Sequence, residues 1–117
     1  MLVRIDPSSA APLHAQISAA VRRGIARGEI APGERLPGAR DLAASLGVNL
    51  HTVLRGYQEL RAEGLVELRR GRGAQVRTDA APAVAALRQA VHVLVEEARR
   101  LGLSSGEVSA MVREAMS

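Results

Sequence analysis

Four polar side chains that can hydrogen-bond to nucleic-acid bases or phosphates lie close together in the middle of the chain: Asn49, His51, Thr52 and Arg55. Asparagine can bridge an adenine, arginine can bind both acceptors of a guanine, and threonine and histidine can contact bases or phosphates. Another arginine, Arg40, precedes them. These residue types at this spacing predict contact with the major groove of double-stranded DNA, provided that one surface presents them together.

A helix over about residues 50–63 is expected to position this polar cluster. Its apolar residues Val53, Tyr57 and Leu60 recur at helical spacing, so burying them turns the polar side chains toward the solvent. Asn49 is expected to be the N-cap, because its short side chain can accept a hydrogen bond from the first turn.

Each of these residues has a simpler explanation when it is taken alone. Asn49 suits a helix cap, His51 an ordinary surface histidine, and Arg55 a solvated helix face. Their coincidence on one predicted surface is what favours DNA contact over these readings.

Two helices are expected to support the element that carries the cluster. The first is predicted by an apolar stripe at intervals of four residues: Leu13, Ile17, Val21 and Ile25. Pro12 suits its first position, and the alternating residues 2–5 before it predict a short strand. A second helix over residues 39–46, with Arg40 near its start, is expected to end at a left-handed Gly47. The tight turn that follows makes a helix-turn-helix, in which the second helix braces the recognition helix.

Two short alternating runs, residues 65–68 and 74–77, surround a glycine-containing loop and predict a β-hairpin. The tip of this hairpin carries Arg70, Gly71 and Arg72, which place positive charge where it can approach the minor groove or neighbouring phosphates. The order helix, helix, tight turn, helix, hairpin is that of a winged helix-turn-helix. The predicted fold class is therefore mainly α with a small β-hairpin wing.

A boundary is expected at residues 78–82, a stretch of polar and small residues that ends in proline. It separates a DNA-binding domain over residues 1–79 from a two-helix tail over residues 80–117, whose last helix is predicted by a capping-box pattern at residues 104–107. An apolar stripe with heptad spacing runs through the first tail helix: Val84, Leu87, Val91, Leu94, Ala98 and Leu101. We interpret this stripe as the interface of a homodimer; alternatively, it packs only against the last helix of its own chain.

The composition agrees with a DNA partner and excludes several other classes. The 117 residues carry a formal net charge of +4, with 16 arginines and no lysine. The surplus lies within residues 1–79, because residues 80–117 contain as many arginines as glutamates. There is no cysteine, and the three histidines lack ligand spacing, so neither an enzyme nor a metal or other cofactor is expected. With no apolar run long enough to span a membrane and no signal-peptide core, we expect a cytoplasmic protein.

Several ordered motifs carry a resemblance to a known family. They are Leu-Pro-x-x-Arg at residues 36–40, Val-Asn-x-x-Thr-Val at residues 48–53, Glu-Gly-Leu-Val at residues 63–66 and Gly-Arg-Gly at residues 71–73. With them, residues 10–77 resemble the DNA-binding domain of the GntR family of bacterial transcription regulators. The short two-helix tail and the Val-Asn motif look most like the YtrA subfamily.

The resemblance implies a homodimer that binds an inverted-repeat operator, usually as a repressor. It carries DNA contacts onto the following positions: Arg40, Asn49, His51, Thr52, Arg70, Gly71 and Arg72. Gly38, Leu50 and Leu54 depart from residues common in the family, so the base contact that relatives make at the position of Leu50 does not carry over to this chain. Most members carry a larger ligand-binding domain; this tail is too short for the usual pocket, and the sequence names no effector.

A protein-interaction module is the alternative from a different class. Its winged helix would dock a protein partner, without sequence-specific DNA binding, while the tail assembles a complex. The dependence of affinity on salt separates the two, because several phosphate contacts per protomer predict a steep fall in affinity as the salt concentration rises.

Overall fold

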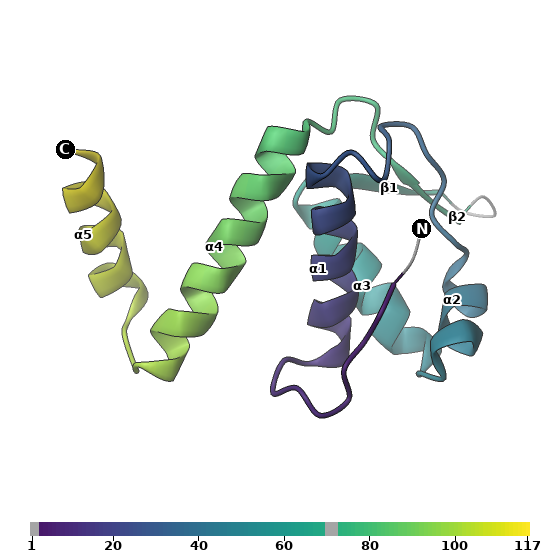
Figure 1. The fold of residues 1–117 in the computed structure, drawn as a ribbon, viewed down its shortest axis with the longest axis horizontal. Helices are drawn as coiled ribbons and strands as arrows, with labels where there is room; N and C mark the ends of the chain where they lie inside the picture. The colour runs from purple at the N-terminus through teal and green to yellow at the C-terminus, as the bar shows by residue number, and fades with distance from the viewer. Residues whose placement is uncertain (1–2, 70–72) are drawn as a thin grey trace.

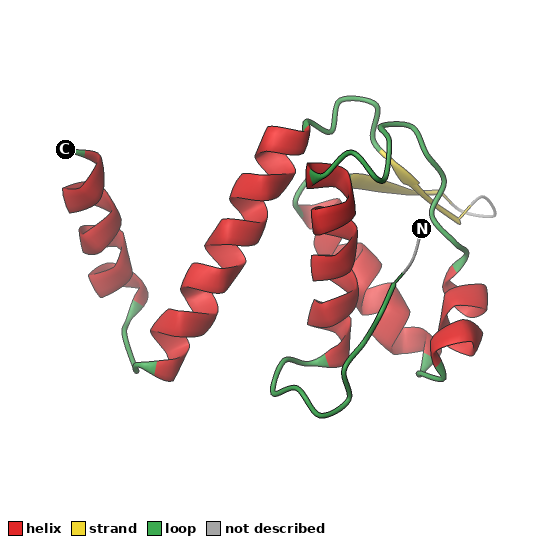
Figure 2. Ribbon diagram, in the orientation of Figure 1, coloured by secondary structure: helices red, strands yellow, loops and turns green. Residues whose placement is uncertain are grey.

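The computed structural model describes residues 3–69 and 73–117. Three helices come first, α1 (Leu13–Ala26), α2 (Ala39–Leu46) and α3 (Leu50–Ala62), and an antiparallel hairpin of β1 (Val66–Arg69) and β2 (Gly73–Val76) follows. The chain ends in α4 (Pro82–Arg100) and α5 (Ser105–Met116). Figure 1 shows the hairpin projecting beside the three-helix group, with the two tail helices at the other side. The predicted winged helix-turn-helix with a helical tail is confirmed, and Figure 2 shows how little of it is strand.

The core lies where the first three helices meet the inner face of the hairpin. The predicted stripe of α1 is fully buried at Ile17, Val21 and Ile25. Helices α1 and α3 approach each other closely at Gly56, where an added Cβ would lie 3.0 Å from the backbone oxygen of His14. A larger residue at Gly56 would push α3 away from α1, so this glycine helps to set the position of α3.

Local signals fix the turn between α2 and α3. Gly47 ends α2 in the left-handed conformation with φ of 67°, as predicted, and its missing Cβ removes the steric cost of that conformation. The side chain of Asn49 then caps α3. The two helices are therefore joined by a turn with both ends specified by the sequence.

The hairpin pairs Val66 with Val76 and Leu68 with Ala74. Each strand lies one residue away from its predicted position, toward the loop. The hairpin is attached to the preceding segment, because the backbone N–H of Leu36 donates to the oxygen of Ala74 at 2.9 Å and an isolated bridge joins Arg35 to Gln75. The wing is thus tied to the chain that leads into α2.

Two expectations for the N-terminus are wrong. Residues 3–5 form no strand, since no neighbouring strand pairs with their backbone; instead Val3 is buried in the core and Ile5 packs against it. Apolar and polar residues alternate in this segment because Val3 and Ile5 face the core while Arg4 is exposed. Pro12 occupies the N-cap, and α1 begins one residue later, at Leu13.

The tail consists of two helices that diverge (Figure 1). Helix α4 begins with Pro82, packs against α1, and contributes Ala85 to the core. Helix α5 is capped by Ser104, as predicted, but none of its residues is buried. No helix within the described ranges is both long and apolar enough to cross a membrane.

Candidate nucleic-acid interface

The first turn of α3 presents polar side chains to the solvent, while the opposite face of the helix is buried. Val53, Tyr57 and Leu60 are fully or almost fully buried, as the sequence predicted. On the outer face His51 and Arg55 are exposed, whereas the neighbouring Leu54 is half-buried. The helix can therefore enter a groove without disturbing the core.

Asn49 performs the capping role expected of it. Its side-chain oxygen accepts a hydrogen bond of 2.8 Å from the backbone N–H of His51. The side chain is exposed, and its amide N–H groups can still donate outward. Thr52, one turn along, is half-buried, so it presents less surface than its neighbours.

The structure thus brings four of the predicted contact residues together at the start of one helix: Asn49, His51, Thr52 and Arg55. Arg40 lies in the first turn of the neighbouring α2 and is exposed. The predicted contacts at the hairpin tip, Arg70, Gly71 and Arg72, lie outside the described residues.

Tyr57 connects α3 to the segment before α2. Its hydroxyl donates a 2.7 Å hydrogen bond to the backbone oxygen of Pro37. Burial raises the pKa of Tyr57 to about 12, because the interior disfavours the phenolate. The hydroxyl therefore stays protonated and able to donate at neutral pH.

Polar contacts that the sequence analysis did not predict hold the C-terminal half of α3 against α1. The carboxylate of Glu59 contacts Nδ1 of His14 and accepts a 2.9 Å hydrogen bond from the buried Ser18 hydroxyl. One turn further on, the single Nε–H of Arg22 donates to both carboxylate oxygens of Glu63, at 2.8 and 3.1 Å. The repeated spacing of four residues on both helices was the available signal for this ladder.

Glu63 also contacts the tail. Nε2 of His92 in α4 lies 2.6 Å from Oε1 of Glu63. Burial raises the pKa of Glu63, but the hydrogen bonds and positive charges of Arg22 and His92 outweigh burial and hold the pKa below its usual value. The carboxylate is therefore ionised at neutral pH, and it links α1, α3 and α4.

The predicted dimerisation stripe of α4 is largely uncovered. Leu87 is 66% exposed and Leu101 65% exposed, and Val84, Val91 and Leu94 are also exposed. Ala98 alone of the stripe is buried, at 8%. Helix α5 does not cover the stripe, so the described part of this chain offers no partner for it.

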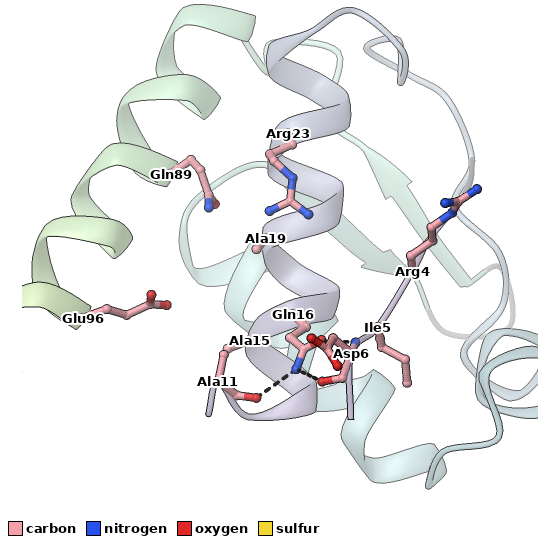
Figure 3. A pocket seen from close by; sticks show the side chains of 10 residues that line it. All are labelled: Arg4, Ile5, Asp6, Ala11, Ala15, Gln16, Ala19, Arg23, Gln89 and Glu96. Carbon is pink, nitrogen blue, oxygen red and sulfur yellow. Dashed lines mark hydrogen bonds between the residues drawn. The ribbon is translucent and has the colours of Figure 1, made fainter. Parts of the chain in front are cut away.

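A groove of about 380 Å³ is lined by residues of the N-terminal segment, α1 and α4. Figure 3 shows Arg23 of α1 and Gln89 of α4 on its facing walls, with Gln16 hydrogen-bonded to Asp6 at one end. Its charged side chains are of both signs: Arg4, Asp6, Arg23 and Glu96.

Within the described ranges, no group of three or more potential metal-ligating side chains is found.

Comparison with known proteins finds both a matching family model and similar transcriptional regulators. Residues 13–76 match the family model described as bacterial regulatory proteins, gntR family. The chain is 37% identical over 79 residues to the HTH-type transcriptional repressor YtrA of Bacillus subtilis; the alignment covers 68% of this chain and 61% of that protein.

Solved structures are similar as well. A YtrA structure from Sulfolobus acidocaldarius, described as a GntR-family transcription factor, has a TM-score of 0.65 at 32% identity and covers 86% of this chain and 99% of that one. AraR(DBD) in complex with operator ORX1 has a TM-score of 0.56 at 27% identity and covers 65% of this chain and 94% of that one. The AraR structure thus covers about two thirds of this chain, and the Sulfolobus acidocaldarius structure covers most of it.

Proposed function

The chain belongs to the gntR family of bacterial regulatory proteins, and from this membership we propose that it is a cytoplasmic, homodimeric repressor of an inverted-repeat operator. It is a transcriptional regulator with a DNA-binding domain. The observation that carries the proposal is the first turn of α3, where polar and basic side chains are exposed on a helix whose other face is buried.

Helix α3 is the recognition helix and lies in the major groove. Arg55 and His51 reach base edges or phosphates, and the amide of Asn49 donates to a base acceptor. Thr52 contacts the groove through its exposed part. Arg40, on the bracing helix α2, contacts the DNA backbone or an adjacent base edge.

The hairpin is the wing and lies at the flanking backbone. Arg70 and Arg72, with Gly71 between them, bind the minor groove or its phosphates. The hydrogen bonds between the hairpin and residues 33–36 support this role, because they hold the wing beside the helix-turn-helix.

The tail over residues 80–117 makes the dimer. The exposed stripe of α4 supports this, because large apolar side chains in helical register are otherwise left in water. One winged helix reads only a few base pairs, whereas two copies related by a twofold axis read both halves of an inverted repeat. Repression is supported by the similarity to the Bacillus subtilis repressor YtrA.

The test begins with selection of bound sequences from a random pool of DNA duplexes. We expect an inverted repeat to emerge, and its affinity to fall with salt with a log–log slope of about −5 or steeper. Transcription in vitro from a promoter that overlaps this sequence should then decrease when the protein is added. A weak salt slope with no preferred duplex would contradict the proposal and favour a protein-interaction module.

A further inference from the structure

We propose that the contact between Glu63 and His92 sets the separation of the two recognition helices in the dimer, and thereby the half-site spacing that the protein accepts in its operator. This inference rests on the proposed homodimer and on α3 as its reading element. The contact joins the two functions directly, because Glu63 is the C-cap of α3 and His92 lies in α4.

The Glu63 end of the contact is rigid. Its carboxylate is held by an ion pair with Arg22 of α1, whose Nε–H is shared by both carboxylate oxygens and whose side chain is 1% exposed. Glu63 itself is 11% exposed. Because an ionised carboxylate only accepts hydrogen bonds, the imidazole N–H of His92 donates across the 2.6 Å separation. Helix α4 is thus fastened to a fixed point at the end of α3.

The face of α4 that meets the DNA-binding domain has little apolar surface. Ala85, Gln89 and His92 follow one another at helical spacing, and of all α4 residues only Ala85 belongs to the core. Gln89 accepts a 3.3 Å hydrogen bond from Nη1 of Arg22. Burial of one alanine is non-directional and allows a helix to rotate, whereas hydrogen bonds have preferred directions. The polar contacts therefore fix the rotation of α4 about its own axis.

Rotation of α4 determines where the dimer partner sits. The exposed stripe from Val84 to Leu101 lies on the side of α4 away from Ala85 and His92. Turning or tilting α4 relative to α3 would carry the partner, with its own α3, to another place along the DNA. Since a rigid dimer fits one half-site spacing, loosening the contact should relax the spacing that is accepted.

The experiment measures the affinity of the full-length protein for its selected operator and for versions with the central spacer changed by one or two base pairs. For the wild type, we expect each spacer change to weaken binding by about tenfold or more. The His92→Ala variant should bind the native and altered spacers with affinities that differ by only about two- to threefold. His92→Gln should restore the discrimination, because the glutamine amide can donate to Glu63 in place of the imidazole.

Arg88→Ala is the matched control, since Arg88 is exposed on the same helix one turn before His92. It should discriminate between spacers as the wild type does. A contact that only stabilises the fold would lower the melting temperature of His92→Ala and leave spacer discrimination unchanged; that result would overturn the proposal. Conversion of His92→Ala to a monomer would also overturn it. Failure of the wild type to bind any duplex would instead contradict the proposed function itself.

Discussion

The hydroxyl of Tyr57 donates a 2.7 Å hydrogen bond to the backbone oxygen of Pro37, which joins α3 to the segment that leads into α2. Tyr57 is the only aromatic residue of the chain and is almost fully buried. This hydrogen bond therefore adds a polar link between α3 and the segment before α2 to the packing of α2 against α3.

Replacing Tyr57 by Phe removes this bond and leaves the Pro37 oxygen without its donor. We expect the free energy of unfolding to fall by about 1–3 kcal/mol at neutral pH, as measured by chemical denaturation. An unchanged stability would mean that solvent replaces the bond at no cost.

Tyr57 should also make the wild type sensitive to alkali. Because burial raises its pKa from 10.0 to about 12, the stability it contributes is complete below pH 10 and is lost as the pH rises toward 12. Tyr57→Phe should lack this component of the alkaline transition. Unfolding measured across this range in both proteins tests the expectation, and identical pH profiles would contradict it.

Arg40→Ala should weaken operator binding by about 1–3 kcal/mol without affecting the fold, because Arg40 is exposed. Fluorescence anisotropy with the selected operator measures the loss. Arg61→Ala is the control, since Arg61 is an exposed arginine at the far end of α3. Equal losses in the two variants would indicate a general charge effect and would argue against a specific role for Arg40.

Leu94→Asp should break the proposed dimer and with it the tight binding of the proposed inverted repeat. A charge placed in the apolar seam loses its hydration when the helices associate. Light scattering coupled to size-exclusion chromatography reports the mass. The control is Val93→Asp, the same chemical change at an exposed residue next to the stripe but off it. If the Leu94→Asp variant were still a dimer, the apolar stripe of α4 would not be the dimer interface.

The ionised Glu63 should make the fold sensitive to acid. Its pKa lies below the usual 4.5, so the stability from its contacts is present above pH 4.5 and is lost as the pH falls through the lowered value. Glu63→Gln leaves the buried Arg22 without its counter-charge and should cost about 3–5 kcal/mol at pH 7. Denaturation at a series of pH values should show a smaller acid loss in this variant than in the wild type.

The sequence predicted those parts of the fold that local chemistry determines. Gly47 and Asn49 mark the end of one helix and the start of the next through their own backbone and side-chain preferences, so the α2–α3 turn was predicted correctly. The heptad pattern likewise predicted α4. Residues 3–5 were predicted wrongly, because alternation alone does not distinguish a paired strand from a segment that packs on the core.

The polar ladder between α1 and the C-terminal part of α3 was not predicted, because its partners are far apart in the sequence. Arg22 and Glu63 are separated by 41 positions, and His92 and Glu63 by 29. From the sequence, His14 and His92 were described only as lacking the spacing of metal ligands, and no partner was predicted for either. Only the packing of α1, α3 and α4 shows that His14 and His92 both contact carboxylates on α3.

The cap on α3 also bears on how this regulator can evolve. The side-chain oxygen of Asn49 caps α3, and its amide N–H groups are available to donate to DNA. One residue therefore serves both the stability of the helix and the proposed recognition of DNA. Only asparagine, aspartate, serine and threonine cap a helix well through their side chains. Few substitutions at position 49 can therefore change the operator preference and keep the cap. Most changes in operator preference are instead expected at His51 and Arg55.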